Sequence, residues 1–344
     1  MTASPHQLIQ FAGTLVVGAA GGVVATFLHL PAPWLLGSML AVASVGFTKV
    51  PLSSPPWLVN VVLPVIGVSL GSGITQETVA GIVKWPVSLG VLLTAVAVSV
   101  TASSAFLIRL GGWDRATAFF ASVPGALSQV LIYATYTKAN MALVTLTQMF
   151  RLLMLMLTLP FLVKLFTHLP SAATPALHVS TNWGTSLLEI GAGALIGYPL
   201  LKLRFPAALL IGGMVASAIG HLSGLTHGVL PNFIILPSQV AFGAVIGERF
   251  RNTDLKLLKL AALPSLGAFS LTLMVMGVAA LATAWGVNLP IALVLVAFSP
   301  GALEVMAILA FVLGVDPVFV AVHHLVRFVS VSVLVPFVVN RFMK

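Results

Sequence analysis

The chain has 344 residues, of which 59% are hydrophobic and 7% are charged, against about 25% charged residues in an average soluble domain. Its mean hydropathy is +1.12. This composition excludes an ordinary soluble enzyme, because a soluble fold cannot bury so much apolar surface. The absence of cysteine excludes disulfides and thiolate chemistry. The net charge of +9 comes from Lys and Arg at the ends of apolar segments, which indicates membrane topology and no nucleic-acid partner.

Apolar segments of about 20 residues predict ten membrane-spanning helices. No Lys or Arg precedes the first of them, so we expect it to remain as a span and not to be cleaved as a signal peptide. The predicted spans are 9–29, 32–48, 57–75, 85–108 and 141–164 in the first half, and 185–203, 205–221, 232–248, 260–285 and 317–340 in the second.

Two further apolar segments, 115–136 and 288–313, are each interrupted by a Pro-Gly pair, Pro124-Gly125 and Pro300-Gly301. Each segment is either a kinked full span or a re-entrant hairpin that enters and leaves the membrane on one side. Non-helical backbone at membrane depth persists only where protein buries it or where it lines a wet cavity. The interruptions are therefore candidate binding sites.

The distribution of Lys and Arg favours hairpins. If both segments crossed fully, inner loops would hold six basic residues and outer loops eight, against the positive-inside rule. With two hairpins, only Lys84 and Lys164 lie outside. The twelve basic residues then placed inside are Lys49, Arg109, Arg115, Lys138, Lys202, Arg204, Arg249, Arg251, Lys256, Lys259, Arg341 and Lys344.

The two halves of the chain are related by an internal duplication. Pro31 returns as Pro206, an offset of 175, and Pro124-Gly125 returns as Pro300-Gly301, an offset of 176. Gly67, Gly71, Arg151 and Pro160 also have identical counterparts 176 residues later, namely Gly243, Gly247, Arg327 and Pro336. We therefore divide the chain into a first repeat at 1–166, an extracytoplasmic linker at 167–183 and a second repeat at 184–344.

Five crossings per repeat place the two repeats in opposite orientations, with both termini in the cytoplasm. The expected fold is an all-α polytopic membrane protein with an inverted-topology repeat, about ten transmembrane helices and two broken Pro-Gly hairpins. Inverted repeats with broken helices near the bilayer midplane are typical of secondary transporters. An elevator-type mechanism is expected, with one bundle sliding past a scaffold that forms a homodimer.

Two arginines, Arg151 and Arg327, lie deep within predicted spans at equivalent positions. An arginine at a span centre costs about 2.5–3.5 kcal/mol on insertion scales, which indicates a use. One interpretation is a pair of positive charges that binds an anionic substrate. The other is an internal ion pair with Glu304, although one carboxylate cannot neutralise both arginines. The counterpart of Glu304 in the first repeat is Ser128.

Polar neighbours accompany both arginines. Gln148 and His324 each precede an arginine by three residues and so share its helix face, and His323 lies four residues before Arg327. His324 and His323 are either proton acceptors or partners in interhelical hydrogen bonds. Adjacent histidines on a helix point about 100° apart, so we expect no metal site and no cofactor. The other six histidines, His6, His29, His168, His178, His221 and His227, lie near span ends or in loops and are expected to be solvated.

The hairpin tips combine a helix start with small residues. Pro124 and Pro300 are expected to be the first residues of a helix, whose free N–H groups and positive dipole end favour anions. Gly125 and Gly301 let a ligand approach the backbone. Ser128, Gln129 and Ser299 supply hydrogen bonds, and Glu304 is a candidate coupling residue for H⁺ or Na⁺.

The motifs PAPWLLG (31–37), SVPGAL (122–127), QMFR (148–151), FSPGALE (298–304) and HLVR (324–327) resemble those of the bacterial membrane AbrB family, over nearly the whole chain. The resemblance implies a duplicated inner-membrane protein. Members carry the labels ammonia monooxygenase and regulator. The sequence argues against both labels, because it has neither a His-rich copper site nor room for a basic soluble module.

We therefore expect a secondary transporter of a small, carboxylate-like organic anion in the bacterial inner membrane, and no enzymatic activity. Its partners would be the small-molecule substrate, the lipid bilayer and a second copy of the chain. One alternative is a membrane sensor that binds a ligand at the same site. Another is an intramembrane enzyme that uses Glu304 and His324 for acid–base chemistry.

Overall fold

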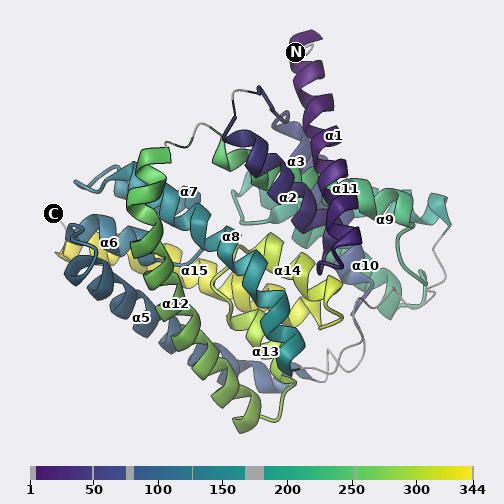
Figure 1. The fold of residues 1–344 in the computed structure, drawn as a ribbon. Helices are drawn as coiled ribbons and strands as arrows, with labels where there is room; N and C mark the ends of the chain where they lie inside the picture. Colours follow the sequence, from purple (N-terminus) through teal and green to yellow (C-terminus); the bar gives the residue numbers. More distant parts are fainter. Residues whose placement is uncertain are drawn as a thin grey trace. The chain divides into compact units, whose positions relative to one another are not determined.

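The computed structural model describes residues 5–48, 50–74, 81–125, 127–166, 182–251, 253 and 255–342, and helices are the regular elements throughout this part of the chain (Figure 1). Residues 167–181 of the predicted linker 167–183 lie outside the described part, and Trp183 already belongs to α9 (Trp183–Lys202). The all-α class is confirmed. Among the described residues, seven helices are long and apolar enough to cross a membrane: α1 (Pro5–Phe27), α5 (Trp85–Arg109), α8 (Met141–Phe166), α9, α11 (Asn232–Gly247, extended by η2, Glu248–Phe250), α12 (Leu255–Gly286) and α15 (Pro317–Phe342).

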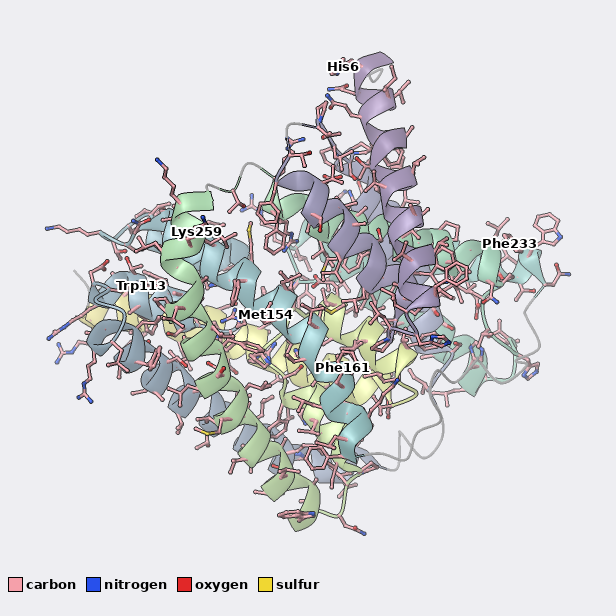
Figure 2. The ribbon with its side chains drawn as sticks, in the orientation of Figure 1. His6, Trp113, Met154, Phe161, Phe233 and Lys259 are labelled. Carbon is pink, nitrogen blue, oxygen red and sulfur yellow. The ribbon has the colours of Figure 1, made fainter. Side chains whose placement is uncertain are left out.

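The outer surfaces of these long helices are apolar. Phe161 of α8 and Phe233 of α11 are 51% and 69% exposed, and both are labelled in Figure 2. In water such exposure along every long helix would be unfavourable, but the hydrocarbon core of a bilayer accommodates it. The chain is thus a multi-pass membrane protein.

Three of the ten predicted spans are shorter than a full crossing. These are α2 (Pro33–Gly46), α3 (Trp57–Gly71) and α10 (Ala208–Leu222), with 14, 15 and 15 residues. At 1.5 Å per residue they measure about 21–23 Å, against about 30 Å of hydrocarbon. Most residues of α3 are buried. More than half of the residues of α2 and α10 are buried as well, so these short helices belong largely to the packed interior of their unit.

The described helices belong to two compact units that cut across the repeats. Unit 1 comprises residues 1–79, 169–253 and 311–318, and it contains α1, α2, α3, α9, α10 and α11. Unit 2 comprises residues 80–168, 254–310 and 319–344. It contains α5, α8, α12, most of α15, and the short helices α6 (Arg115–Ser122), α7 (Leu127–Ala134), α13 (Ile291–Phe298) and most of α14 (Leu303–Val312). Each unit therefore takes helices from both repeats.

Unit 1 is held together by close backbone contacts at glycines. A Cβ on Gly67 of α3 would collide with the carbonyl oxygen of Leu210 of α10. A Cβ on Gly243 of α11 would collide with the carbonyl oxygen of Leu35 of α2. Leu35 and Leu210 are 175 residues apart, and Gly67 and Gly243 are 176 apart. The third helix of each repeat thus packs on the second helix of the other. Small residues permit such close helix packing in membranes.

Candidate functional site

The two Pro-Gly pairs in unit 2 interrupt their segments completely. Asp114 caps α6 by accepting a hydrogen bond from Thr117 N at 2.9 Å, and the helix ends at Ser122. Val123 (ψ 121°) and Ser299 (ψ 141°) are extended, because the ring of a following proline disfavours helical backbone in the preceding residue. The helices are therefore broken and not merely bent.

The helices after the breaks begin later than the prolines suggest. We expected Pro124 and Pro300 to be the first helical residues, but α7 begins at Leu127 and α14 at Leu303. Between each proline and the helix that follows it, the chain turns. Gly125 has φ +79°, which glycine adopts without strain. Gly301 N donates to Ser299 O at 2.9 Å. These turns delay the helix starts, so the free N–H groups lie at least three residues beyond the prolines.

The chain returns after α7 to the point where α6 began. Asn140, just before α8, donates its N–H to Thr117 Oγ1 in the first turn of α6 at 2.7 Å. Further along, Gln148 of α8 bonds to Phe120 and Arg151 bonds to Val123, and both pairs are 28 residues apart. A constant difference means that α8 runs parallel to α6. The helices α6 and α8 therefore start at the same end and run side by side in the same direction.

Arg151 binds the backbone at the first break. Its Nη1 donates to Val123 O at 3.1 Å and lies 3.5 Å from Ser122 O, at the carboxyl end of α6. Its Nη2 donates to Gln148 Oε1 at 3.2 Å, and Gln148 Nε2 donates to Phe120 O at 2.9 Å. The carbonyl end of a helix carries a partial negative charge, so α6 itself stabilises the guanidinium.

Arg327 repeats this arrangement at the second break. Its Nη1 donates to Ser299 O at 2.6 Å and its Nη2 donates to Gly301 O. His324 Nε2 lies 3.2 Å from Val296 O, and Arg327 Nη2 lies 2.6 Å from His324 Nδ1. The pairs Arg327–Ser299 and His324–Val296 become Arg151–Val123 and Gln148–Phe120 when 176 is subtracted from each residue number. The bond of Arg327 to Gly301 is the part of the arrangement that differs. The ion pair with Glu304 is not formed, since Arg327 binds carbonyl oxygens instead.

These bonds determine the tautomer of His324. Arginine can only donate, so Nδ1 accepts, and the carbonyl of Val296 can only accept, so Nε2 carries the proton. In this state the imidazole offers one donor and one acceptor, as the amide of Gln148 does. His324 and Gln148 therefore do the same work in the two repeats, which is to orient an arginine.

The two breaks meet in unit 2. A Cβ on Gly125 would lie 3.7 Å from Arg327 Nη2 and 3.8 Å from Gly301 O. Gly125 itself is only partly buried. The backbone of the first break thus lies against the arginine and the backbone of the second. Arg327 and Arg151 are almost entirely buried, and the described part of the chain provides no acidic ion-pair partner for either of them.

Other predicted site residues lie elsewhere or have other partners. His323 is buried, stacks on Phe319 and bonds to Ser88 of α5 at 2.7 Å, so it points away from Arg327. Gln129 accepts a hydrogen bond from Ser332. Ser299 Oγ donates to Val296 O at 2.7 Å and lies 2.9 Å from Met306 Sδ. The side chain of Ser128 lies outside the described residues.

Glu304 remains a candidate for coupling. It lies in the first turn of α14 and is partly exposed, and none of the described residues forms an ion pair with it. A carboxylate in the first turn stabilises a helix through the macrodipole. Its position beside the second break is consistent with either that structural role or a role in coupling.

His323 also has a counterpart in the first repeat. Thr147 Oγ1 of α8 bonds to Ser265 Oγ of α12 at 2.9 Å, and His323 Nε2 of α15 bonds to Ser88 Oγ of α5 at 2.7 Å. Thr147 and His323 are 176 residues apart, and Ser88 and Ser265 are 177 apart. Each arginine-bearing helix is thus tied to a long helix of the other repeat.

Unit 1 contains a polar cluster that our sequence analysis missed. Glu189 of α9 is 6% exposed, and its Oε1 lies 3.7 Å from His221 Nδ1. His221 was expected to be solvated, but its side chain is only 13% exposed and both of its ring nitrogens have partners. The lone carboxylate within the apolar run 185–203 was the signal that could have revealed the cluster.

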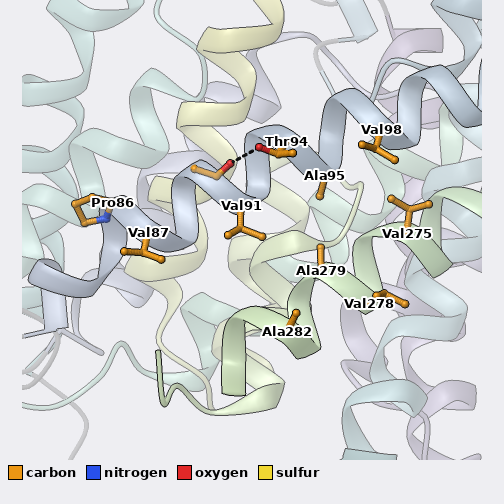
Figure 3. A pocket seen from close by; sticks show the side chains of 11 residues that line it. Pro86, Val87, Val91, Thr94, Ala95, Val98, Val275, Val278, Ala279 and Ala282 are labelled. Carbon is orange, nitrogen blue, oxygen red and sulfur yellow. Dashed lines mark hydrogen bonds between the residues drawn. The ribbon is translucent and has the colours of Figure 1, made fainter. Parts of the chain in front are cut away.

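A cavity of about 540 Å³ lies between α5 and α12 in unit 2. Val87, Val91 and Ala95 face Val275, Ala279 and Ala282 across it (Figure 3). Its lining is almost wholly apolar, and the one side-chain hydroxyl there, of Thr94, is bonded to Gly90 O at 2.9 Å. Such a lining suits hydrocarbon better than an ion, so this cavity is not the polar site.

Comparison with known proteins gives the family. Residues 34–343 match the family described as "Transition state regulatory protein AbrB". The chain belongs to the AbrB family. Among its relatives, "Uncharacterized protein YhjN" of Bacillus subtilis (strain 168) is 26% identical over 368 residues, covering 96% of this chain and 92% of that protein. "Putative regulator AbrB" of Escherichia coli (strain K12) is 24% identical over 321 residues, covering 90% and 89%. The family match confirms the resemblance inferred from the motifs.

Proposed function

We propose that this AbrB-family protein is a secondary transporter of a small, carboxylate-like organic anion that binds in unit 2 where the two helix breaks meet. The observation that carries the proposal is the pair Arg151 and Arg327. Both are buried, both hold the backbone of a break, and they have no acidic ion-pair partner among the described residues. Intramembrane ionisable residues mark substrate pathways by default.

The charges around the breaks favour an anion. The nitrogens of both arginines are bonded to carbonyl oxygens, so the arginines contribute positive potential and orient the breaks. The first N–H groups of α7 and α14 have no partner within their own helices and can contact the anion directly. Gly125 leaves room for the ligand beside the backbone. Gly301 does not, contrary to our expectation, because the side chains of Met306 and Leu155 pack closely against it.

The breaks belong near the bilayer midplane. An eight-residue helix such as α6 or α13 is about 12 Å long, slightly less than half of the hydrocarbon thickness of about 30 Å. The parallel start of α6 and α8 supports a re-entrant hairpin over a kinked span. The contacts that recur at offsets of 175–177 support the inverted repeat. Both termini would then lie in the cytoplasm and the chain in the bacterial inner membrane.

The proposed mechanism is of the elevator type. Unit 2 contains both broken segments, both arginine-bearing helices and the long helices α5 and α12, whereas unit 1 contains α1, α2, α3, α9, α10 and α11. Unit 2 would carry the anion and unit 1 would act as the scaffold, in a homodimer. Coupling to H⁺ or Na⁺ would act through Glu304 and not through His324, whose nitrogens are both occupied.

The occupied nitrogens of His324 also weigh against the enzyme alternative, since a general base needs a free nitrogen within reach of substrate. We therefore propose no catalytic role. A sensor that binds the same anion would need a partner protein. The word "regulator" in the name of the E. coli relative is its main support.

The experiment is a thermal-shift screen of the purified full-length protein against carboxylates, amino acids and inorganic anions, with and without Na⁺ and at two pH values. A ligand present at about 100 times its Kd stabilises the folded state by about 2.7 kcal/mol and raises the Tm. The shift should disappear in Arg151→Lys and Arg327→Lys, which keep the charge but lose the forked bonds. Uptake of the hit into proteoliposomes then separates transport from sensing. Stabilisation by neutral solutes or amines alone would reject the anion site.

A further inference from the structure

We propose that Glu189 and His221 form a proton-binding site in unit 1, which links α9 to the end of α10 and to the segment 223–228 that follows it when it is protonated. The site shares no residue with the two helix breaks of unit 2. The proposal does not depend on what the protein transports.

The hydrogen bonds of His221 suit an imidazolium. Its Nε2 lies 2.8 Å from Gly228 O, and its Nδ1 lies 2.8 Å from Ser217 O. A carbonyl oxygen cannot donate, so both bonds require a proton on the ring nitrogen. His221 is also in the last turn of α10, where the negative end of the helix dipole favours a cation.

Glu189 supplies the opposite charge. Its Oε1 is buried, lacks a hydrogen-bond partner among the described residues, and lies 3.7 Å from His221 Nδ1. A buried, unpaired carboxylate is unfavourable, so the imidazolium is the group that compensates it. The proton is shared by Glu189 and His221 in apolar surroundings, where few other charged groups could compensate the carboxylate.

The site also accommodates the neutral ring. Ser217 Oγ and Thr226 Oγ1 both lie 3.2 Å from Nδ1, and either hydroxyl can donate to it after the proton leaves. Nε2 keeps its bond to Gly228 in that state. Loss of the proton therefore changes the Nδ1 side of the ring, and it leaves Glu189 without its counter-charge.

Few other groups compete for this proton. Helices α3 and α9 pack against α10; α3 has no ionisable side chain, and α9 has only Tyr198 and Lys202 besides Glu189, both nearer its other end. His227 lies in the same segment but is exposed. In the first repeat the counterpart of Glu189 is Thr14, which accepts from Ser53 N at 3.0 Å. The counterpart of His221 is Gly46, so the pair occurs in one repeat only.

The ring has no nitrogen left for a metal ion. Both nitrogens are bonded to carbonyl oxygens, and no group of three or more His, Cys, Asp or Glu gathers among the described residues. A proton is therefore the ligand that fits. Protonation should hold α9 against the end of α10 through the ion pair, and deprotonation should loosen that contact.

The test is hydrogen exchange of the full-length protein in nanodiscs, followed by mass spectrometry from about pH 5.5 to pH 8.5. After correction for intrinsic exchange, protection of residues 186–192 in α9 and 218–222 in α10 should fall about tenfold as the pH rises. The same change should be absent from α1, α2 and α11. Unchanged protection, or an equal loss throughout unit 1, would overturn the proposal.

Three variants sharpen the result. His221→Gln and Glu189→Gln should lose the pH-dependent change in protection, whereas His227→Gln, the exposed histidine of the same segment, should retain it. If His221→Gln or Glu189→Gln does not fold, the exchange profile of the wild-type protein and of His227→Gln decides the matter. Stabilisation by Zn²⁺ that depends on His221 would identify a metal site and contradict the proton site.

Discussion

At the scale of single residues, Gln148 and His324 occupy equivalent positions in the two halves of the chain, and these two different side chains make equivalent hydrogen bonds. Each offers a donor to a backbone carbonyl and an acceptor to an arginine. The equivalence was visible in the sequence only as a matched position. The structure adds its chemical reason, because a neutral histidine protonated on Nε2 presents the same two functions as an amide.

His324→Gln should therefore be tolerated, with the free energy of unfolding within about 1 kcal/mol of wild type. His324→Leu removes the acceptor for Arg327 and the donor for Val296, and should cost about 1–3 kcal/mol. Denaturant titration of purified protein measures both. Equal destabilisation by the two substitutions would mean that ring packing, and not hydrogen bonding, is what matters at this position.

Gly125 offers a second prediction at this scale. Gly125→Ala places a methyl group at φ +79° against Arg327 and Gly301, and should abolish ligand binding at the breaks. Backbone strain alone costs about 1–2 kcal/mol.

The matched control is Gly112→Ala. Gly112 has φ +68°, but a Cβ there would meet nothing within 4 Å. It should show similar strain and normal ligand binding in the thermal-shift assay. Normal binding in Gly125→Ala would place the ligand elsewhere.

At the scale of helices, close glycine contacts account for the short, buried elements of unit 1. Gly213→Ala should push α10 away from α3, since its Cβ would collide with the carbonyl oxygen of Pro64, and overpacking of this kind costs about 1–3 kcal/mol. Gly191→Ala on α9 is the control, because a Cβ there meets nothing within 4 Å. It should be neutral or gain up to about 1 kcal/mol of helix propensity. Thermal unfolding compares the two, and equal stability would argue against close α3–α10 packing.

The helix positions followed from hydropathy alone, because apolar run length reports directly on burial in lipid. Predicted spans 85–108 and 141–164 correspond to α5 at Trp85–Arg109 and α8 at Met141–Phe166. The Pro-Gly pairs located both breaks, since proline excludes helical backbone before it.

The partners of the polar residues could not be predicted. Whether Arg151 binds a carboxylate or a carbonyl depends on how helices pack, and neither periodicity nor spacing contains that information. Glu189 and His221 lie 32 positions apart on different helices. His323 looked like a neighbour of the arginine but faces Ser88, as adjacent helical residues point in different directions.

At the scale of the whole molecule, the orientation of the repeats is open to a direct test because the chain has no cysteine. Tyr136 and Trp285 are both 73% exposed, after α7 and near the end of α12. With two hairpins, Tyr136→Cys should react with a membrane-impermeant maleimide only from the cytoplasm, and Trp285→Cys only from the outside.

Twelve full crossings would reverse both labelling results, so the experiment separates the two topologies completely. Labelling is measured in intact cells and in inverted vesicles, and the unsubstituted chain is the blank. Reaction of both cysteines from one side would contradict the inverted repeat.

The exchange of helix partners in unit 1 has a consequence for biosynthesis. Leu35 of α2 packs against Gly243 of α11, which is translated 208 residues later. At about 5–20 residues per second the delay is about 10–40 s. During that interval the first half has entered the bilayer without the surface that completes it. Assembly therefore cannot proceed one repeat at a time from the ribosome, and a nascent chain stopped midway would leave glycine-lined helix faces available to membrane chaperones and proteases.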